Sequence, residues 1–455
     1  MRRKMQSETK PAALLRGEYE LVHVTAVFRH GARAPISNCD KEGVNDISWG
    51  LCDASARMSA AIEQGHDEIL RLVQHGDESR PPRPSAVDAS QRLTVLDGGC
   101  RCGELTVHGY AQAERLGIKL RELYGAVEPE FLQTRTTHVA RCVLSLRGVL
   151  STLVKKQTQK VQIPALTCHA SDEWLTPSVR GCPRLGELWA QLKKDNAGYI
   201  RTLLQPLTKK MPEQIQDIYK LPNTAIPLKD VLISRRGNAL SMPWGIDDEF
   251  ISAVDNAAAE EVTKLVGSPN NDKASLLLLQ LVAGRLVHDI RSHLFQQVTR
   301  SEHRHPTIRL ISAHDTTILP LLVALGIYDN RWPPFCACCT IELYKNKHDH
   351  EFYVRVCYNG ATSAHIAAEA GYFYVAKSIL PFQEFIALLE NIVLTEDEYQ
   401  AACTTGNTST SHSPISSSPT DLSNNEKEEG IVKEENNTTF IPPPTHTKKK
   451  YVLNE

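Results

Sequence analysis

The chain has 455 residues, of which 41% are hydrophobic, and its formal net charge is −2. This length allows two or three domains, or one large catalytic domain with an insertion, and the hydrophobic content is sufficient for a sizeable core. A net charge so close to zero excludes a global electrostatic field for nucleic acid or for an anionic membrane, so any anion-binding site must be local.

Residues 1–18 are expected to form an N-terminal extension. They are basic but contain no apolar run of the length that a secretory signal needs, so we expect a cytoplasmic protein. Mitochondrial targeting is the alternative, although Glu8 and Pro11 interrupt an amphipathic helix. The longest apolar run, residues 274–284, is too short to cross a hydrocarbon core of about 30 Å, so we expect no integral membrane segment.

The next segment, YELVHVTAVF at 19–28, is rich in β-branched and aromatic residues, which predicts a buried strand. It runs directly into RHGARAP at 29–35, which places Arg29, His30 and Arg33 within five positions. A buried strand that stops at clustered cations is expected to stop at the surface or at an anion.

Strand and helix patterns alternate in the following part of the chain. The spacing of apolar residues predicts a helix over 106–124, and a short strand followed by a helix over 130–153. Residues of about 155–285 show helical segments broken by proline and glycine, with little strand pattern, and are expected to form a mostly helical cap insertion.

A second clear strand, TIRLIS at 307–312, leads into AHDTT and an apolar helix that Asp315 or Thr316 can cap. Farther along, 339–360 predicts a hairpin and 381–393 a helix, and TEDE at 395–398 fits a capping box. Together these patterns indicate an α/β fold over 19–400, with a central, mostly parallel sheet, flanking helices and a helical cap. Residues 401–455 have few large apolar side chains and are expected to be disordered.

The twelve cysteines are expected to be reduced and buried, because no secretory signal is evident. Their two clusters, GCRC at 99–102 and FCACC at 335–339, lack the spacing of a zinc site. We therefore expect no metal ion.

The two clear strands end in a histidine beside charged residues, which makes His30 and His314 candidate neighbours at the carboxyl edge of the sheet. Arg29 and Arg33 carry planar guanidinium groups that match phosphate oxygens, and their charge should keep the His30 imidazole neutral and nucleophilic. Asp315 is then the candidate proton donor for a leaving group.

RHGARAP together with AHDTT resembles the signature of the histidine acid phosphatase family, and the resemblance extends over about residues 19–400, including GELTVHGY at 103–110 and RTTHVAR at 135–141. It implies a phosphomonoesterase with a phosphohistidine intermediate, an α/β core with a helical cap, and no cofactor. His30 would accept the phosphoryl group and Asp315 would protonate the leaving oxygen. The implied phosphate ligands are Arg29, Arg33, Arg135 and His314. Arg141 competes with Arg135 for this role.

Outside these motifs, LGIYDNRWPPF at 325–335 and TIELY at 340–344 resemble the lysophosphatidic acid phosphatase subgroup. The expected partner is therefore a small-molecule phosphomonoester, with lysophosphatidic acid as the leading substrate, and no nucleic acid. The alternatives are another phosphomonoester such as an inositol phosphate, or a catalytically inactive relative that binds a phosphorylated ligand. The sequence indicates no particular oligomeric state.

Overall fold

The computed structural model describes residues 17–404, except for 38, 40, 42, 45, 78–81, 83–84, 156–160, 170–171, 270–271, 301–304 and 359–378. All of these belong to one compact unit, Met1–Thr405, and a second unit comprises Gly406–Glu455. Nearly all of the expected N-terminal extension and most of the tail expected to be disordered therefore lie outside the described residues.

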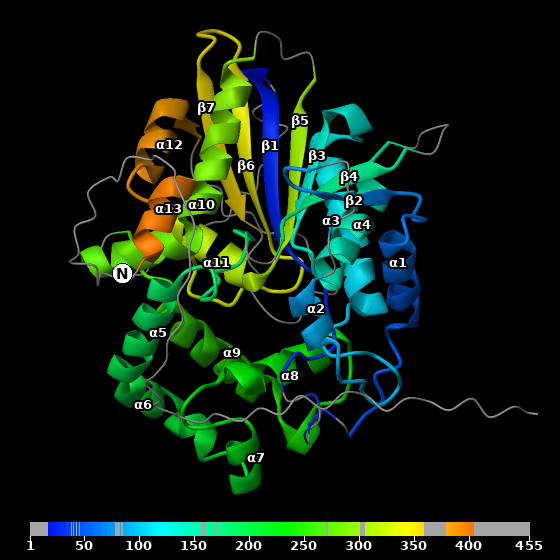
Figure 1. Ribbon diagram of the computed structural model, residues 1–455, viewed down its shortest axis with the longest axis vertical. Coiled ribbons are helices and arrows are strands. Elements are labelled where there is room, and N and C mark those ends of the chain that lie inside the picture. Colours follow the sequence, from blue (N-terminus) through cyan, green and yellow to red (C-terminus); the bar gives the residue numbers. More distant parts are fainter. Residues whose placement is uncertain are drawn as a thin grey trace, which may run out of the picture. The chain divides into compact units, whose positions relative to one another are not determined.

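A sheet of eight strands forms the centre of the described unit (Figure 1), in the order β2-β4-β3-β5-β1-β6-β7-β8. The first five strands in this order run parallel, and β6, β7 and β8 continue the sheet antiparallel. The mostly parallel sheet expected from the sequence is confirmed. The strands are β1 (Tyr19–Arg29), β2 (Leu70–Gln74), β3 (Leu132–Thr136), β4 (Ile163–Thr167), β5 (Thr307–Ala313), β6 (Cys338–Asn346), β7 (Phe352–Tyr358) and β8 (Leu380–Pro381).

Strand β1 lies in the middle of the sheet and is buried on both faces. Val24, Ala26 and Phe28 pack into the apolar cluster on one face, whereas Val27 packs into the cluster on the other. A strand covered on both sides carries a continuous apolar run in place of an alternating pattern, which is the pattern that the sequence shows.

Helices cover both faces of this sheet (Figure 1). One face is covered by α1 (Asp53–Glu63), α3 (Val107–Tyr124) and α4 (Ala140–Leu153), and the other by α10 (Lys273–Val298), α11 (Asp315–Ala324), α12 (Phe382–Leu389) and α13 (Glu396–Cys403). Thr395 and Glu398 form the capping box expected before the last of these helices. Among the described helices, none is long and apolar enough to cross a membrane.

A group of helices lies beyond the carboxyl ends of the parallel strands and forms the cap (Figure 1). It comprises α5 (Pro183–Asp195), α6 (Ala197–Thr208), α7 (Glu213–Ile218), α8 (Ile226–Gly237) and α9 (Asp248–Thr263). Helices α6 to α9 share an apolar cluster with loop residues such as Val44, Trp49 and Leu96. The cap therefore packs on segments that come from the N-terminal part of the chain.

The range expected to be helical, 155–285, differs from the structure at both ends. It contains strand β4, and its last residues belong to α10, which packs on the sheet. Strand β2 was also not expected. Both missed strands have only five residues, and Pro164 interrupts the pattern of β4. Strand β3 is equally short, but the apolar helix pattern that follows it supports the strand.

Six of the twelve cysteines are paired, which corrects the expectation that all are reduced. The disulfides are Cys39–Cys102, Cys52–Cys100 and Cys182–Cys403. Their partners lie 63, 48 and 221 residues apart in the chain, so sequence spacing does not reveal the pairing. The other six cysteines are free and buried, as expected.

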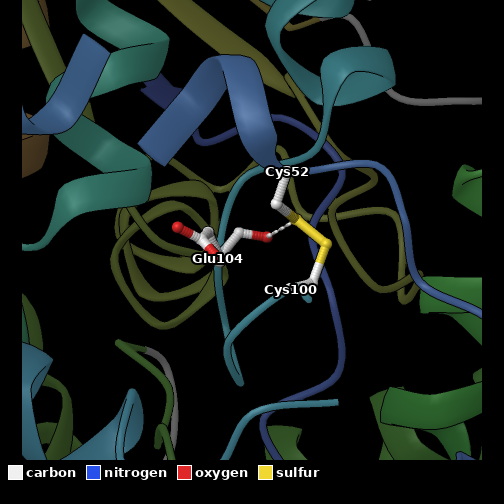
Figure 2. A group of neighbouring side chains, drawn as sticks. All are labelled: Cys52, Cys100 and Glu104. Atoms are coloured by element: carbon white, nitrogen blue, oxygen red, sulfur yellow. Dashed lines mark hydrogen bonds between the residues drawn. A yellow bond between two sulfur atoms is a disulfide. The ribbon is translucent and has the colours of Figure 1, made fainter. Parts of the chain in front are cut away.

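Cys52, Cys100 and Glu104 form a compact group of side chains that resembles a metal site (Figure 2). Both sulfur atoms belong to a disulfide and are therefore not thiolate ligands. The Glu104 carboxylate accepts hydrogen bonds from the Arg101 backbone N–H at 2.8 Å and from the Arg92 guanidinium at 3.3 Å. We therefore interpret this group as a structural disulfide beside the ion pair of Arg92 and Glu104.

The Cys182–Cys403 disulfide connects the residue that precedes α5 of the cap to the last residue of α13. Because a cross-link over a long loop reduces the conformational freedom of the unfolded chain, we expect the Cys182→Ser/Cys403→Ser variant to lose about 2–5 kcal/mol of unfolding free energy. Urea unfolding without reductant measures this loss. Equal unfolding free energies for the variant and the unsubstituted protein would contradict the prediction.

Candidate active site

The pairing of β1 with β5 brings His30 and His314 together. The two strands are parallel, with Arg29 opposite Ala313, and the His30 N–H donates to the Ala313 carbonyl at 3.0 Å. Each histidine is the first residue after its strand, so both side chains lie at the carboxyl edge of the sheet. The centres of the two imidazole rings are 5.6 Å apart.

The turn that carries His30 depends on two glycines. A side chain at Gly31 would collide with the Gly109 carbonyl, and a side chain at Gly109 would collide with the Ala32 carbonyl. The first turn of α3 can therefore pack directly against the loop after β1. This close approach explains why both segments contain glycine at the point of contact.

His30 is held in one tautomer by its own loop. Its Nδ1 lies 2.8 Å from the Gly31 carbonyl oxygen. A carbonyl oxygen only accepts hydrogen bonds, so Nδ1 carries the proton and Nε2 keeps its lone pair. Burial, together with the positive charges of Arg141, Arg29 and Arg33, holds the pKa of His30 well below its ordinary value. His30 is therefore a neutral imidazole with a nucleophilic nitrogen.

Arg29 is buried and connects this loop to Asp315. Its guanidinium donates to an Asp315 carboxylate oxygen at 2.7 Å and to the Pro333 carbonyl at 2.6 Å, and it lies over the ring of Phe335. The Asp315 oxygen that meets Arg29 also accepts a hydrogen bond from the Trp332 indole at 3.0 Å.

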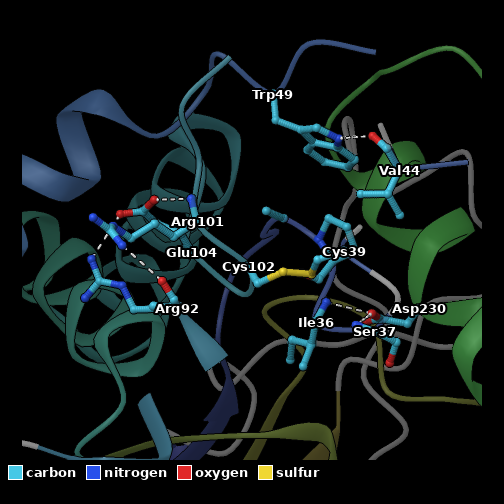
Figure 3. The surroundings of a disulfide bond; sticks show 12 residues. Ile36, Ser37, Cys39, Val44, Trp49, Arg92, Arg101, Cys102, Glu104 and Asp230 are labelled. Atoms are coloured by element: carbon cyan, nitrogen blue, oxygen red, sulfur yellow. Dashed lines mark hydrogen bonds and ion pairs between the residues drawn. A yellow bond between two sulfur atoms is a disulfide. The ribbon is translucent and has the colours of Figure 1, made fainter. Parts of the chain in front are cut away.

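Arg33 is paired with Asp230, which comes from helix α8 of the cap. The distance between the guanidinium and the carboxylate is 2.8 Å. The other Asp230 oxygen accepts hydrogen bonds from the backbone N–H groups of Ile36 and Ser37 at 2.7 and 2.9 Å (Figure 3). The Cys39–Cys102 disulfide fixes the chain a few residues farther on (Figure 3). A cap carboxylate thus holds both the arginine and its loop.

Asp315 is the first residue of α11, and His314 occupies the position before the helix. The expected cap residues, Asp315 and Thr316, are therefore already inside the helix. Burial favours the neutral acid, but the charges of Arg29, Lys229 and Arg33 hold the pKa of Asp315 well below its usual range. Asp315 is ionised in the free protein.

The His314 ring is positioned by Thr137, which follows strand β3. Its Nε2 lies 3.0 Å from the Thr137 hydroxyl oxygen. Burial, with the charge of Arg141 as the next cause, lowers the pKa of His314 to about 3. This second imidazole is therefore neutral as well.

A cavity of about 830 Å³ opens over these groups. His30, Arg33, Arg141, His314 and Asp315 are among its lining residues. Arg141 donates to the neutral Gln91 amide at 2.8 Å and, within the described residues, has no carboxylate partner.

The cavity therefore has an excess of positive charge. Arg33 meets one carboxylate, as does Arg29, which does not itself line the cavity, and Arg141 adds a cation without one. The Nε atoms of all three arginines are buried and lack a hydrogen-bond partner in the described structure. Such a set of donors around a neutral imidazole suits an anion with several oxygen atoms.

Arg135, an expected phosphate ligand, is not among the residues that line this cavity, although its partner Glu173 is. It lies within β3, and its guanidinium forms a buried ion pair with Glu173 at 2.7 Å and packs over Trp174. Arg141, the competing candidate, lies in the first turn of α4, just beyond the carboxyl end of β3. The rule that ligands bind beyond the carboxyl ends of strands would have favoured Arg141. We propose Arg141 as the phosphate ligand in place of Arg135.

A second, smaller cavity of about 200 Å³ lies beside Asp315. It shares Pro177, Asp315 and Thr316 with the larger cavity. Most of its other lining side chains are apolar and come from α5, α9, α10 and α11, with Trp332 at the edge. The candidate acid therefore lies between a cationic cavity and an apolar cavity.

Residues 20–359 match the family described as the histidine phosphatase superfamily (branch 2). The chain belongs to this superfamily. The expected enzyme class, a phosphoric monoester hydrolase of the acid phosphatase type, is confirmed by this membership.

Its curated relatives include proteins named lysophosphatidic acid phosphatase type 6. The mouse protein is 26% identical over 414 residues, which cover 84% of this chain and 88% of the relative, and the human protein is 26% identical over 400 residues, which cover 84% and 86%. A probable acid phosphatase of Schizosaccharomyces pombe is 29% identical over 353 residues, which cover 72% of this chain and 73% of that protein.

Solved structures of bacterial phytases share the fold of this chain. The Hafnia alvei phytase in complex with myo-inositol hexakis sulphate has a TM-score of 0.54 and 13% identity, over 85% of this chain and 99% of its own. The Klebsiella phytase has a TM-score of 0.52 and 16% identity, over 83% and 96%. These similarities establish the architecture of the core and cap.

The replacement of Arg135 by Arg141 is tested by inhibition with inorganic phosphate. We expect Arg141→Met to raise the inhibition constant about 10- to 100-fold, because a charge-assisted hydrogen bond contributes about 1.5–3 kcal/mol. Arg135→Met should change the inhibition constant much less and should mainly lower the melting temperature, since it leaves Glu173 buried without its cation. The opposite ranking of inhibition constants would restore Arg135 as the ligand.

Proposed function

We propose that this phosphatase hydrolyses a lipid phosphate monoester of the lysophosphatidic acid type, through a phosphohistidine on His30. The observation that supports this proposal is the pair of cavities that meet at Asp315, one cationic and one apolar. A lysophospholipid has the matching two parts, a phosphate and an acyl chain. The relatives named lysophosphatidic acid phosphatase support the same substrate class.

In the first proposed step, the His30 Nε2 lone pair attacks phosphorus and the bond from phosphorus to the ester oxygen breaks. Asp315 donates a proton to the departing oxygen, so that a neutral alcohol leaves. Arg29, Arg33, Arg141 and His314 hold the phosphate oxygens during the transfer. In the second step, Asp315 takes a proton from water, the water oxygen attacks phosphorus, and phosphate leaves His30.

The low proton affinity of Asp315 in the free enzyme is consistent with this role. Its ionisation is favoured by the charges of Arg29, Lys229 and Arg33. A phosphate dianion bound to the two arginines cancels part of that positive charge, which raises the pKa of Asp315. Substrate binding thus favours the protonated acid that the first step needs.

The alternatives make different demands on the same cavities. An inositol phosphate would place additional phosphate groups beside the small cavity, whose lining is mostly apolar and includes Lys193 as a single basic residue. A catalytically inactive, phosphate-binding relative would have lost the nucleophile or the acid, and both His30 and Asp315 are present.

We also propose an oxidising compartment in place of the expected cytoplasmic or mitochondrial location. Three disulfides form in the described structure, and stable disulfides are typical of oxidising compartments. Thiol alkylation of the denatured protein, isolated from its own cells without reductant, should then detect the six free cysteines. Labelling of all twelve would support a reducing location.

His30→Ala is expected to abolish turnover and leave the melting temperature nearly unchanged, because no other group occupies the position of the His30 Nε2. Rapid-quench experiments with ³²P-labelled substrate should trap acid-labile phosphate on His30 in the unsubstituted enzyme. Acid-stable phosphate on a serine would refute the phosphohistidine mechanism.

The lipid assignment predicts a dependence on acyl chain length. For monomeric lysophosphatidic acids, kcat/KM should rise by up to about fourfold per methylene until the apolar cavity is filled, since each buried methylene contributes about 0.8 kcal/mol.

Val262→Asn places an amide in this cavity and should flatten the dependence on chain length. Val107→Asn is the matched control, because Val107 is 40% exposed on α3 and lines neither of the two cavities. Equal rates for all chain lengths, with higher rates for inositol phosphates, would overturn the lipid assignment and leave the phosphatase class intact.

A further inference from the structure

Helix α8 carries a buried cation, Lys229, which has no role in the phosphate site described above. Lys229 is only 4% exposed. In the described part of the chain, its ammonium group forms no ion pair with a carboxylate. Burial lowers its pKa to about 7, with Arg29 as the next cause. Lys229 is therefore charged at acidic pH, where its charge acts on its neighbours with little screening by water.

The contact that Lys229 makes leads to Asp315. Its ammonium group lies 3.5 Å from the centre of the Trp332 ring, which is the geometry of a cation–π interaction. The Trp332 indole N–H donates to the Asp315 carboxylate at 3.0 Å. Lys229 thus fixes the ring that holds the candidate general acid, and it does so from the cap.

The charged groups around Asp315 come from several elements. Arg29, at the end of β1, and His30 and Arg33, in the loop after it, surround the phosphate position, and Lys229 comes from α8. Asp255 of α9 also faces Lys229 and Asp315, and Asp230 faces Lys229.

Within this cationic set, Lys229 and Arg29 line neither the cationic cavity nor the apolar cavity. Arg29 meets the Asp315 carboxylate directly, whereas Lys229 lies over the Trp332 ring. A phosphate dianion offsets the charges of Arg29 and Arg33, so the charge of Lys229 continues to act on Asp315 during the reaction.

We propose that Lys229 is a positioning residue for the general acid. Through Trp332 it holds the Asp315 carboxyl group at the leaving oxygen, and its charge sets the pH above which Asp315 no longer donates a proton. This inference rests on the proposed role of Asp315.

The test compares an alkyl ester, glycerol 2-phosphate, with an aryl ester, p-nitrophenyl phosphate, as a function of pH. Lys229→Met keeps the length of the side chain and removes its charge. We expect kcat for the alkyl ester to fall about tenfold at the optimum of the unsubstituted enzyme. The alkaline limb of its pH profile should move up by about one unit, because loss of a nearby cation favours the protonated acid.

The aryl ester and the KM values distinguish a positioning role from a purely structural one. A structural defect would lower kcat for both esters alike. The aryl kcat and both KM values should change less than about threefold, since a phenolate leaves without much protonation. Lys229→Arg keeps the charge and should restore the position of the alkaline limb. Lys264→Met is the matched control, because Lys264 also lies over an aromatic ring of the cap, at 5.0 Å from the centre of Tyr199.

Two outcomes would overturn the inference. One is an unchanged alkaline limb in Lys229→Met, and the other is an equal loss of kcat on the alkyl and aryl esters. The acid role itself is tested with Asp315→Asn on the same two esters, where equal losses of kcat would refute the role on which this inference rests. Lysophosphatidic acid is absent from this experiment, so failure of the lipid assignment is detected separately by the series of acyl chains.

Discussion

The register between β1 and β5 is the constraint on which the site depends. Arg29 pairs with Ala313, so β1 and β5 end side by side, and His30 and His314 are the next residues of the two segments. A shift of one residue would turn each side chain of the displaced strand to the opposite face of the sheet. His30 would then no longer face His314, and Arg29 would no longer reach Asp315. The apolar packing of β1 on both faces prevents such a shift.

The carboxyl edge of the sheet carries several positive charges, and the cap supplies a carboxylate that pairs with one of them. The core supplies Arg29, Arg33 and Arg141, and helix α8 supplies Asp230, which pairs with Arg33. Removing one member of a buried ion pair typically costs about 3–5 kcal/mol, because the partner is left buried and unpaired. Docking of the cap is therefore required for a stable arrangement of the arginines. The anion site belongs jointly to the core and the cap.

A strand or a site residue can be predicted from the sequence when the pattern that identifies it lies within one continuous segment. The long apolar run of β1 and the motif at 29–33 were identified because both are local. Strands β2 and β4 were missed, and each has only five residues; β3 is equally short, but a helix with a clear apolar pattern soon follows it. The sequence does not choose between Arg135 and Arg141, because the choice depends on where β3 ends and α4 begins.

Other contacts between distant segments had no local signal. Asp230 and Lys229 reach the site through the packing of the cap, and nothing in the segment around Trp332 indicates that its indole meets Asp315. The disulfide partners were hidden for the same reason. The residues that perform chemistry on the substrate stand in recognisable motifs, whereas the residues that position them were found only in the folded chain.

The Cys182–Cys403 disulfide also has a consequence for the order in which the protein matures. The two disulfides among residues 39–102 can close while most of the chain is still being synthesised. The third cannot close until residue 403 has emerged from the ribosome, after every residue of the catalytic site. A nascent chain thus contains every residue of the candidate site before its cap is covalently fastened. A transcript that stops just short of Cys403 would encode an enzyme with all of its chemical groups and an unfastened cap.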